Sequence, residues 1–294
     1  MPAQLLAYPP DRAAIACLVD TEESVLVGRA PECGLRLDHP SVSRRHAELR
    51  REGEGWRLTD LGSKNGSFLN GERVSNSLLA TLAWLRFGDV ACEFTPLGRE
   101  EFARTAQRQA RRRENSIVLA QRLQEQTALP DLLLDTLRAV CELADCERGF
   151  LLLAEANGLQ VRATHALDPA SLSRREFSGS IGAIERAVTS CRPVVLNEFG
   201  LDPSLGARAS VVAGGLQTLV SLPLLDGGEV LGVVYADSRR PGATITELDL
   251  DLLRAFSERA ALWIAARRDA RALAALATPP RWSDILAAHS GTAE

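Results

Sequence analysis

The chain has 294 residues and a formal net charge of -4, and 46% of its residues are hydrophobic. This length predicts about two compact domains, and the mild acidity argues against a protein that coats nucleic acid. No apolar run reaches the roughly 18 to 20 residues that span a bilayer. The start, MPAQLLAYPPDR, lacks the basic residues and the apolar stretch of a signal peptide. We therefore expect neither a membrane nor a nucleic-acid partner.

The first 96 residues alternate between short apolar runs and turn-rich breaks. The breaks include YPPD, REGEG, LGSKNG and LNGE, and the apolar runs are QLLAY, AAIACLV, SVLVG, LRL, HAELR, WRLTDL, SFLN, WLRF and VACEF. Strands at this spacing, without long helical periods between them, predict a β-sandwich or a barrel.

Between Arg99 and about Gln126 the strand pattern is absent, and Arg, Gln, Glu and Ala dominate. This composition predicts a solvated helix that connects two domains. Three consecutive arginines, 111–113, lie in its middle. They are too few, and too close to acidic residues, to favour a nucleic-acid arm.

From Leu129 onward, helical and strand patterns alternate. Apolar residues at i, i+3, i+4 spacing predict an amphipathic helix in LPDLLLDTLRAVCELAD, and SIGAIERAVTSCR is helical as well. Hairpins are predicted at Asn157-Gly158 and Gly227-Gly228. The predicted strands are GFLLLAEA, LQVRATHAL, PVVLNEF, TLVSLPLLD and EVLGVVYADS, and a short segment near SLGARASVVAGG precedes the last two.

A last long helix is predicted to begin at Thr246, because Thr246 and Asp249 fit a capping box. It extends to about Ala277, where Thr278-Pro279-Pro280 stops it. The remaining residues predict a flexible tail. The second domain is therefore expected to be α+β, an antiparallel sheet with helices at its start, middle and end.

Six cysteines are scattered along the chain without a CxxC pair. This spacing fits neither a disulfide framework nor a zinc finger. We expect them to be small buried hydrophobic residues in a reducing cytoplasm. They are Cys17, Cys33, Cys92, Cys141, Cys146 and Cys191.

The stretch SVSRRHAEL, Ser41 to Leu49, gathers hydroxyls, guanidinium groups and an imidazole. A hydrolase triad, a metal site and an anion pocket would each use some of these groups. The chain contains no GxxxxGK[ST], HExxH or GxSxG motif, and its four histidines argue against a multi-histidine metal centre. His46-Ala47-Glu48 resembles half of a zinc-deaminase motif, but no PCxxC follows it. We therefore expect no catalytic residue, no metal and no enzyme activity.

An anion pocket fits better, since three segments carry suitable residues. Gly28-Arg29 ends a predicted strand, Ser43–His46 precedes another, and Lys64-Asn65-Gly66 lies in a turn. Loops at one end of a sandwich converge easily. Arginine forms bidentate bonds with phosphate, and a serine hydroxyl donates to the same group.

These residues, GR, then SxxH, then DLGSKNGSFLNG, resemble a forkhead-associated (FHA) domain over roughly residues 1 to 96. The resemblance implies a β-sandwich of about eleven strands that binds phosphothreonine peptides. It places Arg29 and Ser43 on the phosphate and Asn65 on the peptide backbone. Arg44 matches a position that often touches the ligand, and Lys64 is a further rim residue.

The same resemblance gives His46 an architectural role, bracing the binding loops from within. Gly28 and Gly66 are expected to permit tight backbone turns. Taken singly, Arg29 is better explained as a surface arginine, Ser43 as a turn residue and Asn65-Gly66 as a hairpin turn. Their order along a strand-rich domain favours binding.

The region from about residue 129 to 270 resembles a GAF domain, through the helix LPDLLLDTLRAVCELAD, the segments CRPVVLNEF and SLPLLDGGEVLGVVYADS, and the closing TELDLDLLRAFSERAALWI. Such domains bind cyclic nucleotides, tetrapyrroles, haem or small metabolites, or serve as dimerisation modules. Asn197-Glu198-Phe199 lacks the lysine of the family's cyclic-nucleotide signature. Cys191 has a different context from a bilin-attachment cysteine, and His165 is more simply a strand residue. A pocket is expected, its ligand stays unknown, and no cofactor is assigned.

We thus expect a multidomain protein: an all-β FHA sandwich over 1–96, a helical linker over 97–128, an α+β GAF domain over 129–270, and a helix end with a flexible tail over 271–294. Helices flanking the GAF core supply apolar material for a homodimer, although no clean heptad repeat is present. The leucines expected to contribute are Leu119, Leu123, Leu129, Leu132 and Leu133.

The expected function is a cytoplasmic signalling adaptor in bacteria that docks on a threonine-phosphorylated protein, a Ser/Thr kinase or its substrate. FHA and GAF domains in this order resemble the sensory half of bacterial transcription regulators. Two alternatives stay open. One is a small-molecule sensor in which the GAF pocket dominates and the FHA domain is a phosphate-independent scaffold, and the other is an enzyme without a recognisable motif.

Overall fold

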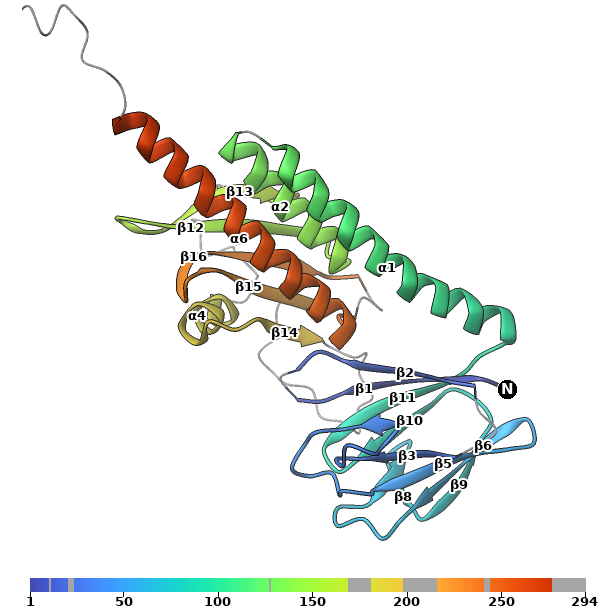
Figure 1. Cartoon of the computed structure of the whole chain (residues 1–294). Helices are drawn as coiled ribbons and strands as arrows, with labels where there is room; N and C mark the ends of the chain where they lie inside the picture. The colour runs from blue at the N-terminus through green and yellow to red at the C-terminus, as the bar shows by residue number, and fades with distance from the viewer. Residues whose placement is uncertain are drawn as a thin grey trace, which may run out of the picture.

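The structure is a computed structural model that describes residues 1–10, 12–20, 24–126, 128–168, 181–197, 216–240 and 244–276. A sandwich of β-strands comes first, and an antiparallel sheet with helices on both faces follows it (Figure 1). A long helix joins the two. The predicted fold class is confirmed.

The sandwich has eleven strands in the described part of the chain, as expected. Six form one sheet in the order β2-β1-β11-β10-β7-β8, and five form the other in the order β4-β3-β5-β6-β9. The strands are β1 (Ala3–Tyr8), β2 (Ile15–Val19), β3 (Val25–Gly28), β4 (Leu35–Arg36), β5 (Ala47–Glu52), β6 (Gly55–Asp60), β7 (Ser67–Leu69), β8 (Glu72–Val74), β9 (Asn76–Leu79), β10 (Ala83–Phe87) and β11 (Val90–Pro96).

Alternate side chains of these strands fill one apolar core between the two sheets. Trp56, Phe87 and Phe94 are its largest fully buried side chains. Strands β8 and β9 have no counterpart among the predicted apolar runs, because most of their side chains are exposed or only half-buried. A strand at a sheet edge needs little apolar sequence.

The second domain has a five-stranded antiparallel sheet in the order β13-β12-β16-β15-β14. Its two predicted hairpins are present, since Glu155 pairs with Gly158 and Asp226 with Glu229. The elements are α2 (Leu129–Leu143), β12 (Arg148–Glu155), β13 (Gly158–His165), α4 (Ile181–Ser190), β14 (Val194–Asn197), β15 (Thr218–Asp226), β16 (Glu229–Ser238) and α6 (Glu247–Leu276).

Helices cover both faces of this sheet (Figure 1). The long helices α2 and α6 pack on one face through a large apolar cluster that includes Leu137, Val220 and Phe256. Helix α4 packs on the other face, where Ala187 lies in a smaller cluster with Tyr235. The predicted start, middle and end helices are therefore found.

The connecting helix is α1, Arg99–Glu125. Its first half is largely exposed, as expected for a solvated linker. Its second half differs from that expectation, because Leu119, Ala120 and Leu123 are buried in the same apolar cluster as α2 and α6. Leu132 and Leu133 of α2 are buried there as well, so these four leucines fill the core of the chain and are not available to a second copy. Three apolar residues at i, i+1, i+4 form a narrow stripe that the polar composition of the helix conceals.

The start of α6 carries the predicted capping box. The Asp249 backbone N–H donates to the Thr246 hydroxyl at 3.3 Å, and the Asp249 carboxylate accepts from the Thr246 N–H at 2.9 Å. Asp249 is buried and also accepts from Arg112 of α1 at 2.7 Å. This carboxylate therefore ties α1 to the first turn of α6.

The two domains touch where the loop between β1 and β2 meets α6. Ala14 forms an isolated parallel bridge with Thr246. Ala13 is 2% exposed and belongs to the apolar cluster of the second domain. The lower end of α6 lies beside β1 and β2 in Figure 1.

Three sequence-based expectations fall outside the described residues: the segment near SLGARASVVAGG, the tail after Leu276, and the residues Glu198 and Phe199 of the cyclic-nucleotide comparison. No described helix is long and apolar enough to cross a membrane. All six cysteines are free thiols. Four of them are buried, and Cys17 and Cys191 are half-buried.

Candidate functional site

Ser43 lies at the meeting point of the three predicted binding segments. Its backbone carbonyl accepts from the Arg29 N–H at 3.0 Å, and its hydroxyl accepts from the Lys64 N–H at 3.1 Å. The Asn65 side-chain amide donates to the carbonyl of Ser41 at 2.7 Å. One end of the sandwich therefore gathers Arg29, Ser43, Lys64 and Asn65 around one loop.

His46 holds two of these segments from the inside. Its Nδ1 accepts from the Ser43 N–H at 3.1 Å, so Nε2 carries the proton and donates to the Gly66 carbonyl at 3.1 Å. The ring is fully buried and lies nearly perpendicular to the Phe87 ring, with an interplanar angle of 80°. Burial lowers the pKa of His46, although the Gly66 bond and the nearby Asp60 oppose the shift. A neutral imidazole is thus built into the loop support.

Gly28 is needed because two backbone segments come very close together. A Cβ at this position would lie 2.3 Å from the carbonyl oxygen of Arg44. That oxygen also accepts from the Ala30 N–H at 3.0 Å. The backbone on both sides of Gly28-Arg29 is therefore fixed against the Ser43-Arg44 segment.

The turn that carries Lys64 and Asn65 is organised by Asp60. Its carboxylate accepts from the N–H groups of Gly62 and Ser63, each at 2.9 Å, and from the hydroxyls of Ser63 and Ser67, at 2.7 and 2.6 Å. Burial works against ionisation, but these bonds hold the pKa of Asp60 below its ordinary value. Gly66 completes the turn with a φ of 80°.

The side chains at this end are open to solvent and mostly basic. Arg29, Arg44, Lys64 and Asn65 are exposed, whereas Ser43 is half-buried. Because Ser43 Oγ accepts from Lys64, its own proton is available to a ligand. Hydroxyl, amide and guanidinium donors side by side suit a phosphate.

Sequence reasoning did not single out Ser41 and Asp60, which support the loops, or Arg73, whose guanidinium lies against Gly66. Ser41 accepts from Asn65 through its carbonyl and from the Asp89 N–H through its hydroxyl, at 2.8 Å. The sequence offered a signal for two of them, because both lie next to Asn-Gly turns. Asp60 begins the turn DLGSKNG, and Arg73 follows the turn LNGE.

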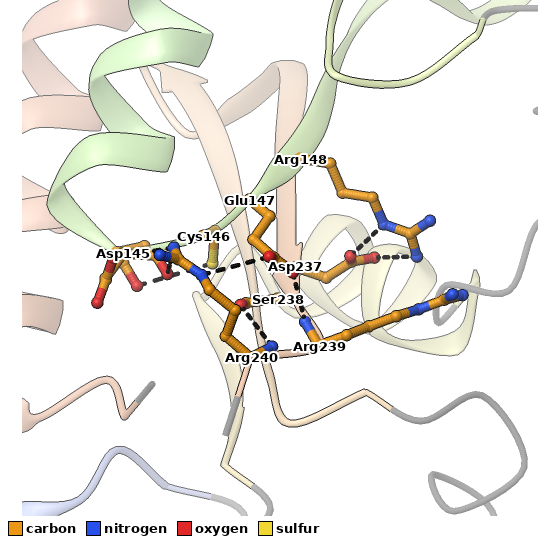
Figure 2. A network of polar contacts seen from close by, with 9 residues as sticks. Asp145, Cys146, Glu147, Arg148, Asp237, Ser238, Arg239 and Arg240 are labelled. Atoms are coloured by element: carbon orange, nitrogen blue, oxygen red, sulfur yellow. Dashed lines mark hydrogen bonds and ion pairs between the residues drawn. The ribbon is translucent and has the colours of Figure 1, made fainter. Parts of the chain in front are cut away.

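A second polar cluster, in the α+β domain, was not predicted from the sequence (Figure 2). Arg148 grips the fully buried Asp237 with two bonds, at 2.5 and 3.2 Å. Around it, the Arg239 N–H donates to Glu147 at 3.0 Å, and Arg240 pairs with Asp145 at 3.1 Å. The cluster joins the end of β16 to the segment between α2 and β12.

Asn197 and His165 were compared with ligand-binding residues of GAF domains in the sequence, and Asn197 has a structural role. Asn197 binds the backbone of Ile245 on both sides, donating to its carbonyl and accepting from its N–H, each at 2.9 Å. His165 is the last residue of β13. Among the described residues, no group of three or more His, Cys, Asp or Glu side chains is placed to hold a metal.

Parts of the chain are similar to known proteins. The chain is 42% identical over 59 residues to the oxoglutarate dehydrogenase inhibitor of Corynebacterium jeikeium, covering 20% of this chain and 41% of that protein. It is 47% identical over 53 residues to the glycogen accumulation regulator GarA of Mycolicibacterium smegmatis, covering 18% and 34%. The chain thus spans less than half the length of either relative.

Among solved structures, the GAF domain of a phosphoenolpyruvate-protein phosphotransferase from Coxiella burnetii is 17% identical, with a TM-score of 0.44, over 56% of this chain and 98% of that one. The FHA domain family model matches residues 25–90, and the GAF domain family model matches residues 128–264. The protein therefore consists of an FHA domain followed by a GAF domain.

Proposed function

We propose that the chain is a signalling adaptor that binds a threonine-phosphorylated protein through its FHA domain. Its partner is a Ser/Thr kinase or a substrate of one, and the chain itself catalyses no reaction. The observation that carries the proposal is the placement of Ser43, whose carbonyl binds the Arg29 backbone and whose hydroxyl binds the Lys64 backbone. We call this arrangement of Arg29, Ser43, Lys64 and Asn65 the Ser43 cradle, and we propose that it binds the phosphate together with the peptide that carries it.

Each residue has a distinct part in this proposal. Arg29 and Arg44 supply charge-assisted bonds to the phosphate, and Ser43 donates its hydroxyl proton. Asn65 already donates one bond to Ser41, which leaves its carbonyl oxygen to accept an N–H of the peptide. Lys64 adds charge at the rim.

The test is a titration of the whole chain with one peptide in phosphothreonine, phosphoserine and unphosphorylated forms, chosen from a phosphopeptide array. We expect binding of the phosphothreonine form alone, and a loss of at least about tenfold in affinity in Arg29→Ala. The matched control is Arg50→Ala, an exposed arginine on β5. Unchanged affinity in Arg29→Ala refutes the proposal, and equal binding of the unphosphorylated peptide favours the scaffold-and-sensor alternative.

The proposal includes a homodimer and a cytoplasmic location. Ile117 and Val118 of α1 are 58% and 47% exposed, and Leu262 and Leu273 of α6 are 64% and 66% exposed. Large apolar side chains on two adjacent helices suit pairing with a second copy. Sedimentation of the wild type and of Leu262→Glu tests this, since the charged variant should be monomeric. The free thiols fit a reducing compartment.

A further inference from the structure

Five exposed basic side chains surround the Ser43 cradle: Arg29, Arg44, Arg45, Lys64 and Arg73. None of them forms an ion pair within the part of the chain that the structure describes, whereas Arg57 on nearby β6 pairs with Glu52. Two acidic side chains of this region are already engaged, since Asp38 pairs with Arg12 and Asp60 accepts the hydrogen bonds of its own turn. The other acidic side chains there are three: Glu32, Glu72 and Asp89. The end of the sandwich that carries the cradle therefore has an excess of unpaired positive charge.

Arg73 is the member of this group that comes from outside the three binding segments. It lies on β8, where it pairs with Phe68 of β7. Its guanidinium lies against Gly66, because a Cβ on Gly66 would come within 2.7 Å of Arg73 Nε and 3.2 Å of Nη2. Glycine at position 66 therefore leaves the space that this guanidinium occupies, next to Asn65.

A second arginine on the same row of the sheet shows the contrast. Arg86 of β10 pairs with Phe68 from the other side, and its guanidinium lies over the Phe68 ring at 3.5 Å. It also donates to the Gly88 carbonyl at 2.6 Å. Arg86 is thus held by its neighbours, whereas no hydrogen bond of the Arg73 side chain occurs among the described residues.

We propose that Arg73 is a specificity-determining residue, which pairs with an acidic side chain of the bound peptide close to the phosphothreonine. The inference rests on the proposed function, since Asn65 would hold the peptide backbone directly beside this guanidinium. An arginine fork matches a carboxylate with two parallel bonds. The preferred ligand is therefore an acidic phosphothreonine peptide.

The experiment compares phosphothreonine peptides in which Glu replaces Gln at one position at a time, on both sides of the phosphothreonine. For the wild-type chain we expect Glu at one of these positions to tighten binding roughly three- to fivefold, as for a partly exposed ion pair. Arg73→Gln should abolish that preference and keep the requirement for phosphate. Arg73→Glu should make the chain prefer Lys at the same position.

The control variant is Arg50→Gln, which should leave the preference unchanged. A wild type with no acidic preference at any position, or a preference that survives in Arg73→Gln, overturns the inference alone. Binding that does not depend on phosphate overturns the proposed function and this inference with it. Circular dichroism melting of each variant establishes that the sandwich remains folded.

Discussion

Ala14 of the FHA domain and Thr246 of the GAF domain form a backbone bridge between the two domains. The Ala14 N–H donates to the Ile245 carbonyl at 2.9 Å, and the Ala14 carbonyl accepts from the Glu247 N–H at 2.8 Å. The bridge lies at the first turn of α6, which Asp249 caps and ties to α1. The sandwich and helix α1 therefore both contact the first turn of α6.

This bridge predicts that a charge at Ala13 will separate the domains, because Ala13 is buried in the apolar cluster of the GAF domain. In Ala13→Asp, the amide of Glu247 should lose its partner on Ala14 and exchange at least about tenfold faster with solvent. Hydrogen exchange measures this directly. Ala103→Asp, at an exposed position of α1, is the control, and unchanged protection of Glu247 in Ala13→Asp would contradict the docking.

The sequence was sufficient to predict elements whose pattern is local. The hairpins at Asn157-Gly158 and Gly227-Gly228, the capping box of α6 and the amphipathic face of α2 all follow from residues close to one another in the chain. The register of β8 and β9 was not predictable, because their side chains are mostly exposed and give no apolar alternation.

The site divides in the same way. The positions of Arg29, Ser43 and Asn65 follow from a recognisable order of residues in the sequence. The place of Arg73 depends instead on how β8 pairs with β7, which brings its guanidinium over Gly66. The Arg148–Asp237 pair joins residues that are 89 positions apart, and no local pattern announces a contact of that range.

Because His46 is buried, we expect the stability of the FHA domain to depend on pH. Burial lowers the folded-state pKa of His46 below the ordinary value of 6.5, so the unfolded chain binds the proton first as pH falls. Stability is therefore complete above about pH 6.5 and decreases below it, down through the folded-state pKa. Asp60, whose pKa is held below 3.8, titrates at more acidic pH and does not contribute in this window.

Urea denaturation followed by tryptophan fluorescence checks this dependence, with His46→Gln as the comparison. At pH 8 the variant should be less stable by about 1–3 kcal/mol, because the Ser43 N–H and the Gly66 carbonyl lose their partner. Its stability should also change less than that of the wild type between about pH 7 and 5.5. Equal pH slopes in the two proteins would show that His46 is not the titrating group.

Gly28→Ala should weaken both the fold and the binding of a phosphopeptide. The added methyl group would lie 2.3 Å from the Arg44 carbonyl oxygen, so one of the two backbone segments must move. Overpacking of this kind lowers the free energy of unfolding by about 1–3 kcal/mol. Because Arg29 is displaced, the variant should bind the phosphopeptide about tenfold more weakly. Gly98→Ala is the control, since no atom lies within 4 Å of its added methyl group. Wild-type affinity in Gly28→Ala would contradict the close packing.

Arg148→Met should destabilise the GAF domain strongly, because it leaves the fully buried Asp237 without its bidentate partner (Figure 2). Removing one partner of a buried pair costs about 3–5 kcal/mol, whereas replacing both by apolar residues is often nearly neutral. The double variant Arg148→Met, Asp237→Leu should therefore recover most of the loss. Arg240→Met, which removes the exposed ion pairs of Arg240 with Asp145 and Glu147, should cost only about 1 kcal/mol. Thermal denaturation of the four proteins decides, and a single variant as stable as the double one would show that Asp237 does not need Arg148.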